Sequence, residues 1–169
     1  MLRILVATGD GLLTLDQQGH EAAKQHAGRS VTAVVRDGRQ LWAILDRTQV
    51  WYSPEGEWRH VASLEGVAAE GRGTYDGGRG IRREYLILRG PEVATYYAEQ
   101  TNERFRPSGA AGGGDGAPSR VTVLDPDGGR LDLPPKGTVE VSVGTTVRFE
   151  TSGGGGFGPS SGSGRSGKR

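Results

Sequence analysis

Cysteine is absent from this sequence, and large apolar side chains are scarce. Without cysteine the chain forms no disulfide bond and no cysteine-based zinc site, and it offers no thiol nucleophile. Only 34% of the 169 residues are hydrophobic, so we expect a small core of limited stability. The sequence also lacks an apolar run of about 18 residues that would cross a bilayer, and a signal peptide at its start. These absences predict a cytoplasmic protein.

An excess of charge of one sign is lacking too, and the formal net charge is +1. Residues 1–70 hold 7 basic and 9 acidic side chains, and residues 71–169 hold 14 and 11. Neither imbalance, −2 or +3, is large enough to indicate binding to nucleic acid or to an anionic membrane.

Composition changes sharply near residue 70. Residues 1–70 contain 7 of the 30 glycines, and residues 71–169 contain the other 23. Every tryptophan and histidine lies in the first part: Trp42, Trp51, Trp58, His20, His26 and His60. We therefore predict two parts, 1–65 and 71–158, joined by a seam at 66–70.

Short strands account for most of the first part. Asp37 and Gly38 stand between two runs rich in β-branched residues, which is a strong hairpin signal. Only residues 21–28 have a composition that suits a helix, although a loop or a strand fits their length equally well. The predicted strands lie at 2–7, 12–15, 30–35, 40–45, 49–52 and 58–64.

The spacing of these strands resembles β-propeller repeats of the sialidase type, and residues 53–58 resemble a degraded Asp-box turn. A blade needs four strands, and a propeller has about four to eight blades. One copy of residues 1–65 therefore cannot close a propeller, and its outer strands would expose unpaired backbone groups. This resemblance implies a non-catalytic binding or scaffolding module that uses its sheet edges and its three tryptophans.

No metal site is predicted. His20 and His26 are the nearest pair of histidines, but residues at this spacing would lie on opposite sides of a helix. Neither cysteine nor a carboxylate at ligand spacing accompanies them. We interpret both as solvated histidines.

The second part also predicts strands, separated by long glycine loops. Residues 138–143 and 145–150 carry Val and Thr at alternate positions on either side of Gly144, which predicts a hairpin with one apolar face. Further strands are predicted at 81–88, 92–98, 121–124 and 130–133. The fold is thus predicted to be all-β, with antiparallel propeller-blade-like hairpins, a small glycine-rich β unit and a disordered tail at 159–169.

Five short blocks occur in order in the second part, at 71–85, 104–109, 112–118, 133–137 and 151–158. This series resembles the C-terminal end of the hydantoinase B/oxoprolinase family. The sequence departs from the family pattern at Asp76, where Arg is usual, at Thr145, where an acidic residue is usual, and at Ser152, where Pro is usual.

The resemblance implies a subunit of ATP-dependent enzymes that hydrolytically open cyclic amides such as hydantoins and 5-oxoproline. In such assemblies a hydantoinase A-like partner subunit handles ATP, and the metal ion of the carboxylase relatives is held upstream of this tail. Neither cofactor is expected in this chain. Family members are much longer, so we expect a fragment that is inactive alone. A further hypothesis is that two gene fragments were joined and that the product has no activity.

Three cations within the family-like blocks are our choice for contact with a substrate carboxylate or a neighbouring subunit: Arg82, Arg104 and Lys136. The guanidinium fork suits a planar carboxylate. The alternative is that all three are solvated surface cations. No residue is predicted to be catalytic, because no pair of acids stands at a recognisable spacing.

Glycines of two tracts are the remaining candidates for contact with a substrate or a subunit: Gly112, Gly113, Gly154 and Gly155. A backbone without Cβ atoms lets a ligand approach closely, and successive N–H groups cradle anions. The alternative is that these glycines are turns that pack closely against the rest of a larger subunit.

Overall fold

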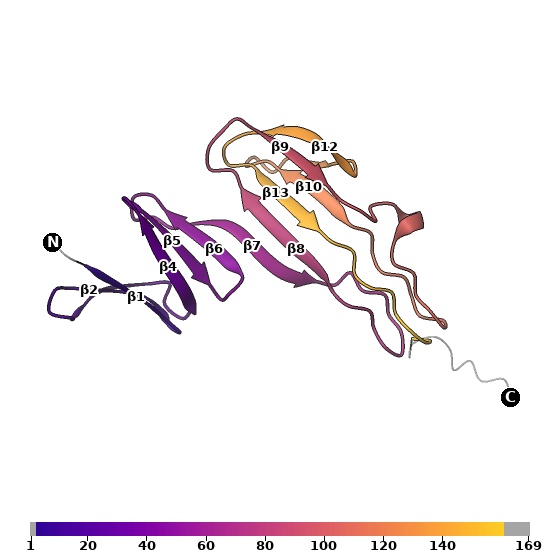
Figure 1. Cartoon of the computed structure of the whole chain (residues 1–169), viewed down its shortest axis with the longest axis horizontal. Helices are drawn as coiled ribbons and strands as arrows, with labels where there is room; N and C mark the ends of the chain where they lie inside the picture. Colours follow the sequence, from indigo (N-terminus) through magenta and orange to yellow (C-terminus); the bar gives the residue numbers. More distant parts are fainter. Residues whose placement is uncertain (1–2, 161–169) are drawn as a thin grey trace. The chain divides into compact units, whose positions relative to one another are not determined.

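The computed structural model describes residues 3–160, which fall into two compact units on either side of the Ser63–Leu64 peptide bond (Figure 1). Regular structure in this range is β throughout, except for one 3-10 turn at Glu103–Phe105. The predicted all-β class is therefore confirmed. No helix among the described residues is long and apolar enough to span a membrane. Of the tail at 159–169 that was predicted to be disordered, residues 161–169 lie outside this range.

Unit 1 is made of antiparallel hairpins. A three-stranded sheet has the order β1-β2-β3, and β4 to β7 follow as a meander in chain order. Asp37 pairs with Gln40 across the predicted Asp-Gly turn, so this hairpin is confirmed. Within residues 3–160 the strands close into neither a barrel nor a propeller. The strands are β1 (Ile4–Thr8), β2 (Gly11–Leu15), β3 (Glu21–Gln25), β4 (Val31–Asp37), β5 (Gln40–Leu45), β6 (Gln49–Ser53) and β7 (Arg59–Val67).

The core of unit 1 comes from side chains of β2, β4 and β5. Leu12 and Leu45 are fully buried and lie beside Val31 and Ala43. Burial of a side chain of this size contributes about 1.5–3 kcal/mol. Residues 21–28, left open between helix, loop and strand, begin with β3, which pairs with β2.

Unit 2 combines a sheet with a separate pair of strands. The sheet has the order β11-β10-β13-β8, while β9 pairs only with β12. Its own strands are β8 (Gly80–Leu86), β9 (Glu92–Tyr97), β10 (Arg120–Leu124), β11 (Arg130–Asp132), β12 (Lys136–Val141) and β13 (Thr146–Glu150).

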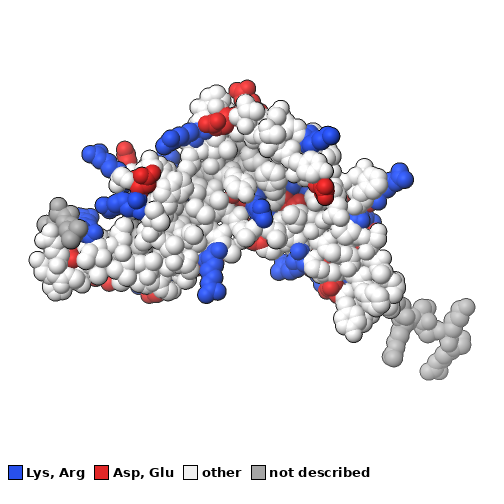
Figure 2. Space-filling view, viewed as in Figure 1, with Lys and Arg blue, Asp and Glu red and all other residues white. Residues whose placement is uncertain are grey.

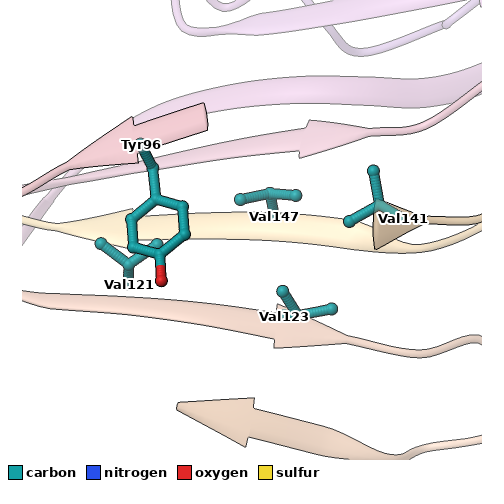
Figure 3. Packing of buried hydrophobic residues seen from close by; sticks show 5 residues of the cluster. All are labelled: Tyr96, Val121, Val123, Val141 and Val147. Atoms are coloured by element: carbon teal, nitrogen blue, oxygen red, sulfur yellow. The ribbon is translucent and has the colours of Figure 1, made fainter. Parts of the chain in front are cut away.

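The core of unit 2 lies between these two layers. Tyr96 of β9 and Val141 of β12 meet Val121, Val123 and Val147 of the sheet (Figure 3). All five side chains are buried. The pair β9–β12 therefore covers one face of the sheet, and the chain crosses between layers on its way from β8 to β9 and from β12 to β13 (Figure 1).

The predicted hairpin between residues 138–143 and 145–150 is wrong. β12 pairs with β9, whereas β13 lies between β10 and β8. Gly144 does provide the turn, with φ of +88°, but the turn carries the chain from one layer to the other. The physical reason is burial: Val141 and Val147 face each other across the core in this arrangement instead of lying side by side in one exposed ribbon.

Candidate functional site

Arg82 is the predicted contact residue that forms ion pairs within the described part of the chain, with Glu150 and Glu65. It lies on β8 opposite Glu150 of β13, and Glu150 lies opposite Arg120 of β10. The three side chains therefore form one row across the sheet, at the end where β8 and β10 begin. Sequence spacing could not reveal this row, because only the pairing register brings together residues from three strands.

The guanidinium of Arg82 is held firmly. Its Nε and Nη2 donate to the same carboxylate oxygen of Glu150, at 3.0 and 2.6 Å. Its Nη1 donates to Glu65 Oε1 at 3.5 Å. The hydrogen bond to Glu150, followed by the nearby negative charges, raises the pKa of Arg82 above its ordinary value. Arg82 is therefore a fixed cation of the sheet face.

A depression of about 450 Å³ opens beside this row. Small side chains form much of its wall, and three arginines and two glutamates line it, giving a formal lining charge of +1. We call it the arginine depression. Its lining residues are Glu65, Gly66, Val67, Ala68, Ala69, Arg79, Arg82, Ala117, Pro118, Arg120, Glu150 and Thr151.

Arg79 and Arg120 differ from Arg82 in that no carboxylate of the described residues lies within ion-pair distance of their guanidinium groups. Among residues 3–160, neither forms an ion pair or a side-chain hydrogen bond. The guanidinium of Arg79 lies over Gly66, 4.0 Å from the position a Cβ there would take. Arg120 makes a smaller contribution to the lowered pKa of Asp132, which is mainly due to hydrogen bonds from Thr122 and Arg130. Both arginines are exposed.

The other two predicted cations lie elsewhere in unit 2. Arg104 belongs to the 3-10 turn, and its guanidinium lies over the ring of Phe105 at 5.5 Å. Lys136 begins β12 and lies opposite Tyr97 of β9. Both are exposed. The structure does not bring Arg82, Arg104 and Lys136 together into one site.

The predicted glycines belong to two of three segments that extend from the same end of the sheet, where β8 and β10 begin and β13 ends (Figure 1). Gly71 N–H donates to the Gly154 carbonyl at 2.9 Å, Gly114 N–H to that of Arg72 at 2.7 Å, and Gly156 N–H to that of Gly114 at 2.8 Å. Each segment thus hydrogen-bonds to both others. We call residues 69–78, 108–117 and 152–158 the glycine bundle.

The glycine bundle is packed too tightly for side chains at its centre. A Cβ on Gly77 would lie 2.0 Å from the carbonyl oxygen of Gly154, and one on Gly113 would lie 2.2 Å from that of Gly156. Contacts below 3.0 Å are essentially never made by real Cβ atoms. Collagen follows the same logic, because only glycine fits near its crowded axis. Much of the glycine content is therefore explained by packing within unit 2.

The predicted contact glycines take part in this packing to different degrees. The N–H of Gly113 donates to the Ala110 carbonyl, and that of Gly154 donates to the Gly78 carbonyl. These two donors are occupied and are not offered to an anion. A Cβ on Gly155 would lie 2.1 Å from the carbonyl oxygen of Ser108. The geometry agrees with close packing, and the packing partner is unit 2 itself.

Gly112 lies at the rim of the bundle. Its φ of +89° favours glycine, whereas the nearest atom to a Cβ there is 3.8 Å away. Its conformation, and not a lack of space, requires glycine at this turn.

Two aspartates tie the bundle's turns together, and the sequence analysis missed their role. Asp76 accepts from the Gly73 N–H at 3.1 Å and from Arg72 at 2.7 Å. Asp115 accepts from the Gly109 N–H and from Arg106. In each case the backbone hydrogen bond, followed by the arginine, lowers the pKa of the carboxyl. Asp within a glycine-rich turn is the signal that could have found them, since Asp readily bonds nearby backbone N–H groups.

Ser152 and Thr145, two departures from the family pattern, are also held by hydrogen bonds within unit 2. The Ser152 N–H donates to Ser119 Oγ at 2.9 Å, and its hydroxyl donates to Gln100 Oε1 at 2.5 Å. Proline at this position could not make the first of these bonds. Thr145 is buried, and its N–H donates to the Ser142 carbonyl at the crossing turn.

Unit 1 gathers two of its tryptophans and two of its histidines into one cluster. The ring of His26 lies 4.8 Å from that of Trp58 and 5.3 Å from that of Trp51, and Trp51 lies 5.4 Å from His60. Buried nitrogens of His26, Trp58 and His60 have no hydrogen-bond partner among the described residues. Burial, followed by the nearby charge of Arg29, lowers the pKa of His26.

The described residues contain no group of three or more His, Cys, Asp or Glu side chains placed to hold a metal ion. His20 is exposed and pairs with Asp16, while His26 lies in the aromatic cluster. Basic and acidic side chains are interspersed in the view of Figure 2, with no broad patch of one sign.

Comparison with known proteins gives one family. The family model of hydantoinase B/oxoprolinase matches residues 66–160, which are 95 of the 169 residues. No curated protein and no solved structure matches. The matched range covers the glycine bundle, the arginine depression apart from Glu65, and all of β8 to β13. By this match over more than half of its length, the chain belongs to the hydantoinase B/oxoprolinase family.

Proposed function

We propose that unit 2 serves as a structural, non-catalytic part of an ATP-dependent enzyme that opens cyclic amides, together with a hydantoinase A-like subunit that handles ATP. The observation that supports this proposal is that two residue ranges coincide, that of the family match and that of the packed structure of unit 2. The family model matches residues 66–160, and the glycine bundle and two-layered core fill the same range. What the family signature encodes here is thus largely a packed backbone scaffold.

The glycines support a structural role because their positions are fixed by neighbouring backbone. The carbonyl oxygens nearest to Gly77, Gly113 and Gly155 all belong to other segments of the bundle. A scaffold of this kind holds its surface rigidly without a large apolar core, which suits a unit that presents a fixed face to a partner subunit. In this proposal the chain is inactive alone.

The test is reconstitution with a hydantoinase A-like subunit. The purified chain and the partner are assayed separately and together for ATP-dependent opening of N-methylhydantoin and 5-oxoproline, and their association is measured by analytical ultracentrifugation. We expect a complex, and ring opening only when both proteins and ATP are present. Ring opening by the chain alone, or no association with any hydantoinase A-like subunit tested, would contradict the proposal.

A second candidate function is binding by unit 1 without catalysis. An entirely apolar groove of about 210 Å³ lies on the β4–β6 face and is lined by Ala33, Val35, Trp42, Ala43, Ile44 and Val50. Val35 is 60% exposed. Under this alternative, Val35→Glu would abolish binding of a partner to unit 1 and leave ring opening in the reconstituted enzyme unchanged. The first proposal predicts that the variant associates with the hydantoinase A-like subunit as the parent chain does.

A further inference from the structure

The arginine depression has the chemistry of a ligand site that the proposed function does not use. Arg79 stands just before β8, Arg82 lies on β8 and Arg120 begins β10, and all three line one concavity. Exposed arginines such as Arg79 and Arg120 are ordinarily solvated singly, but here they line one hollow together with the half-buried Arg82. The volume of the hollow, about 450 Å³, lies within the size range of small-molecule sites.

The three arginines have different roles in the depression. Arg82 is held by Glu150 and Glu65, so it forms a preorganised wall. Arg79 and Arg120 have no ion pair or side-chain hydrogen bond within the described part of the chain, so their donors are available to a ligand. Each guanidinium presents a planar fork that fits a carboxylate with two parallel hydrogen bonds.

The rest of the lining selects the kind of anion. Glu65 and Glu150 bring two negative charges to the same hollow, which disfavours a doubly charged phosphate and leaves a net lining charge of +1. Val67, Ala68 and Pro118 provide a short apolar wall. A ligand with one carboxylate and a short aliphatic body matches both features.

We propose that the arginine depression binds a small aliphatic monocarboxylate, with Arg79 and Arg120 as the carboxylate contacts. The inference rests on the geometry of unit 2 and is independent of the proposed function. A carboxylate at the end of another protein's chain has the same chemistry, and the test below separates it from the free small molecule.

The test is titration of the isotope-labelled full chain with butyrate, followed by amide chemical shifts in nuclear magnetic resonance spectra. We expect saturable shifts around Ala68 and Ala117, and none with butyramide, which has nearly the same shape without the charge. The double variant Arg79→Gln/Arg120→Gln should bind butyrate at least about tenfold more weakly, because it removes both charge-assisted contacts to the carboxylate.

Arg89→Gln is the matched control, since Arg89 is an exposed arginine of unit 2 outside the depression, and it should bind butyrate as the parent chain does. Shifts that do not saturate, equal shifts with butyramide, or full displacement of butyrate by equimolar phosphate would overturn the inference. Saturable binding of a tripeptide with a free carboxyl end, combined with no binding of butyrate, would also overturn it in favour of a protein ligand. Both variants should keep the parent circular dichroism spectrum.

Discussion

Unit 1 and the glycine bundle of unit 2 are held together by different means. In unit 1, side chains fill the interior: Leu12 and Leu45 are fully buried, and aromatic rings pack beside them. In the glycine bundle of unit 2, backbone meets backbone, and the Gly71 N–H bonds directly to the Gly154 carbonyl. Unit 1 is therefore stabilised by buried side chains, whereas the bundle is stabilised by backbone contacts that are possible only where side chains are absent.

This difference teaches where each unit tolerates change. A buried leucine can be shortened at the cost of a cavity, and the neighbours relax in part. A Cβ on Gly77 would lie 2.0 Å from a carbonyl oxygen, and its neighbours could not relax in this way, because moving that oxygen would move a neighbouring segment and its hydrogen bonds. The smallest chemical change, one methyl group, should therefore do the most damage in the bundle.

The largest effects are expected at the tightly packed glycines, for example for Gly155→Ala, whose Cβ would lie 2.1 Å from the Ser108 carbonyl oxygen. We expect unit 2 to lose about 3 kcal/mol or more of stability, the upper end for overpacking. Denaturant unfolding followed by amide hydrogen exchange of residues 64–160 measures the loss. Unchanged protection there would show that the segments separate easily. Gly9→Ala is a control, since nothing lies within 4 Å of a Cβ at Gly9.

Next in size is Leu45→Ala in unit 1. The side chain is fully buried, so its truncation should cost about 2–5 kcal/mol. All three tryptophans lie in unit 1, so tryptophan fluorescence during urea unfolding reports this loss. Ile44→Ala, at the adjacent position with 40% of its surface exposed, should shift the midpoint much less. Equal shifts would argue against a side-chain core in unit 1.

A moderate effect is expected from acid. The pKa of His26 in the folded chain lies below its ordinary value of 6.5, because burial and Arg29 disfavour the cation. Below pH 6.5 the unfolded state therefore binds more protons, and unit 1 loses stability as the pH falls toward the folded pKa of His26. Tryptophan fluorescence unfolding at pH 7.5 and 5.5 measures the change.

The control for the acid effect is His26→Asn, because Asn tolerates the φ of +52° found at this position. The variant should show a smaller loss of stability between the two pH values than the parent chain. An equal loss in both would assign the effect to other groups.

The smallest effect is expected for Tyr75→Ala. The side chain is 70% exposed, while the backbone of Tyr75 exchanges hydrogen bonds with Phe157 in both directions. Stability should change by no more than about 0.5 kcal/mol, as for ordinary surface positions. A thermal unfolding scan checks this, and a large loss would mean that side chains as well as backbone hold the bundle.

The sequence predicts strands better than it predicts their partners. Asp37 and Gly38 locate a hairpin because the turn and the pairing are both local. Gly144 also marks a turn, yet β12 pairs with β9, which lies far back in the sequence. Local alternation fixes which face of a strand is apolar, whereas the partner is decided by what covers that face in the folded unit.

The candidate site shows the same limit. Arg82 was identifiable from its block, which also contains Arg79, but Arg120 joins them only through the pairing of β8, β13 and β10. The glycine tracts were visible as candidates for close approach. What they approach, each other's carbonyls, follows from three segments that meet at one end of a sheet and are far apart in the sequence.

The most direct test of the central claim compares two adjacent glycines. A Cβ on Gly77 would lie 2.0 Å from the Gly154 carbonyl oxygen, whereas nothing lies within 4 Å of a Cβ on Gly78. Gly77→Ala and Gly78→Ala are measured side by side by denaturant unfolding, with hydrogen exchange of residues 152–158 as the local readout. We predict that Gly77→Ala destabilises unit 2 and removes this protection, while Gly78→Ala leaves both unchanged. Equal behaviour of the two variants would contradict the backbone-packed bundle.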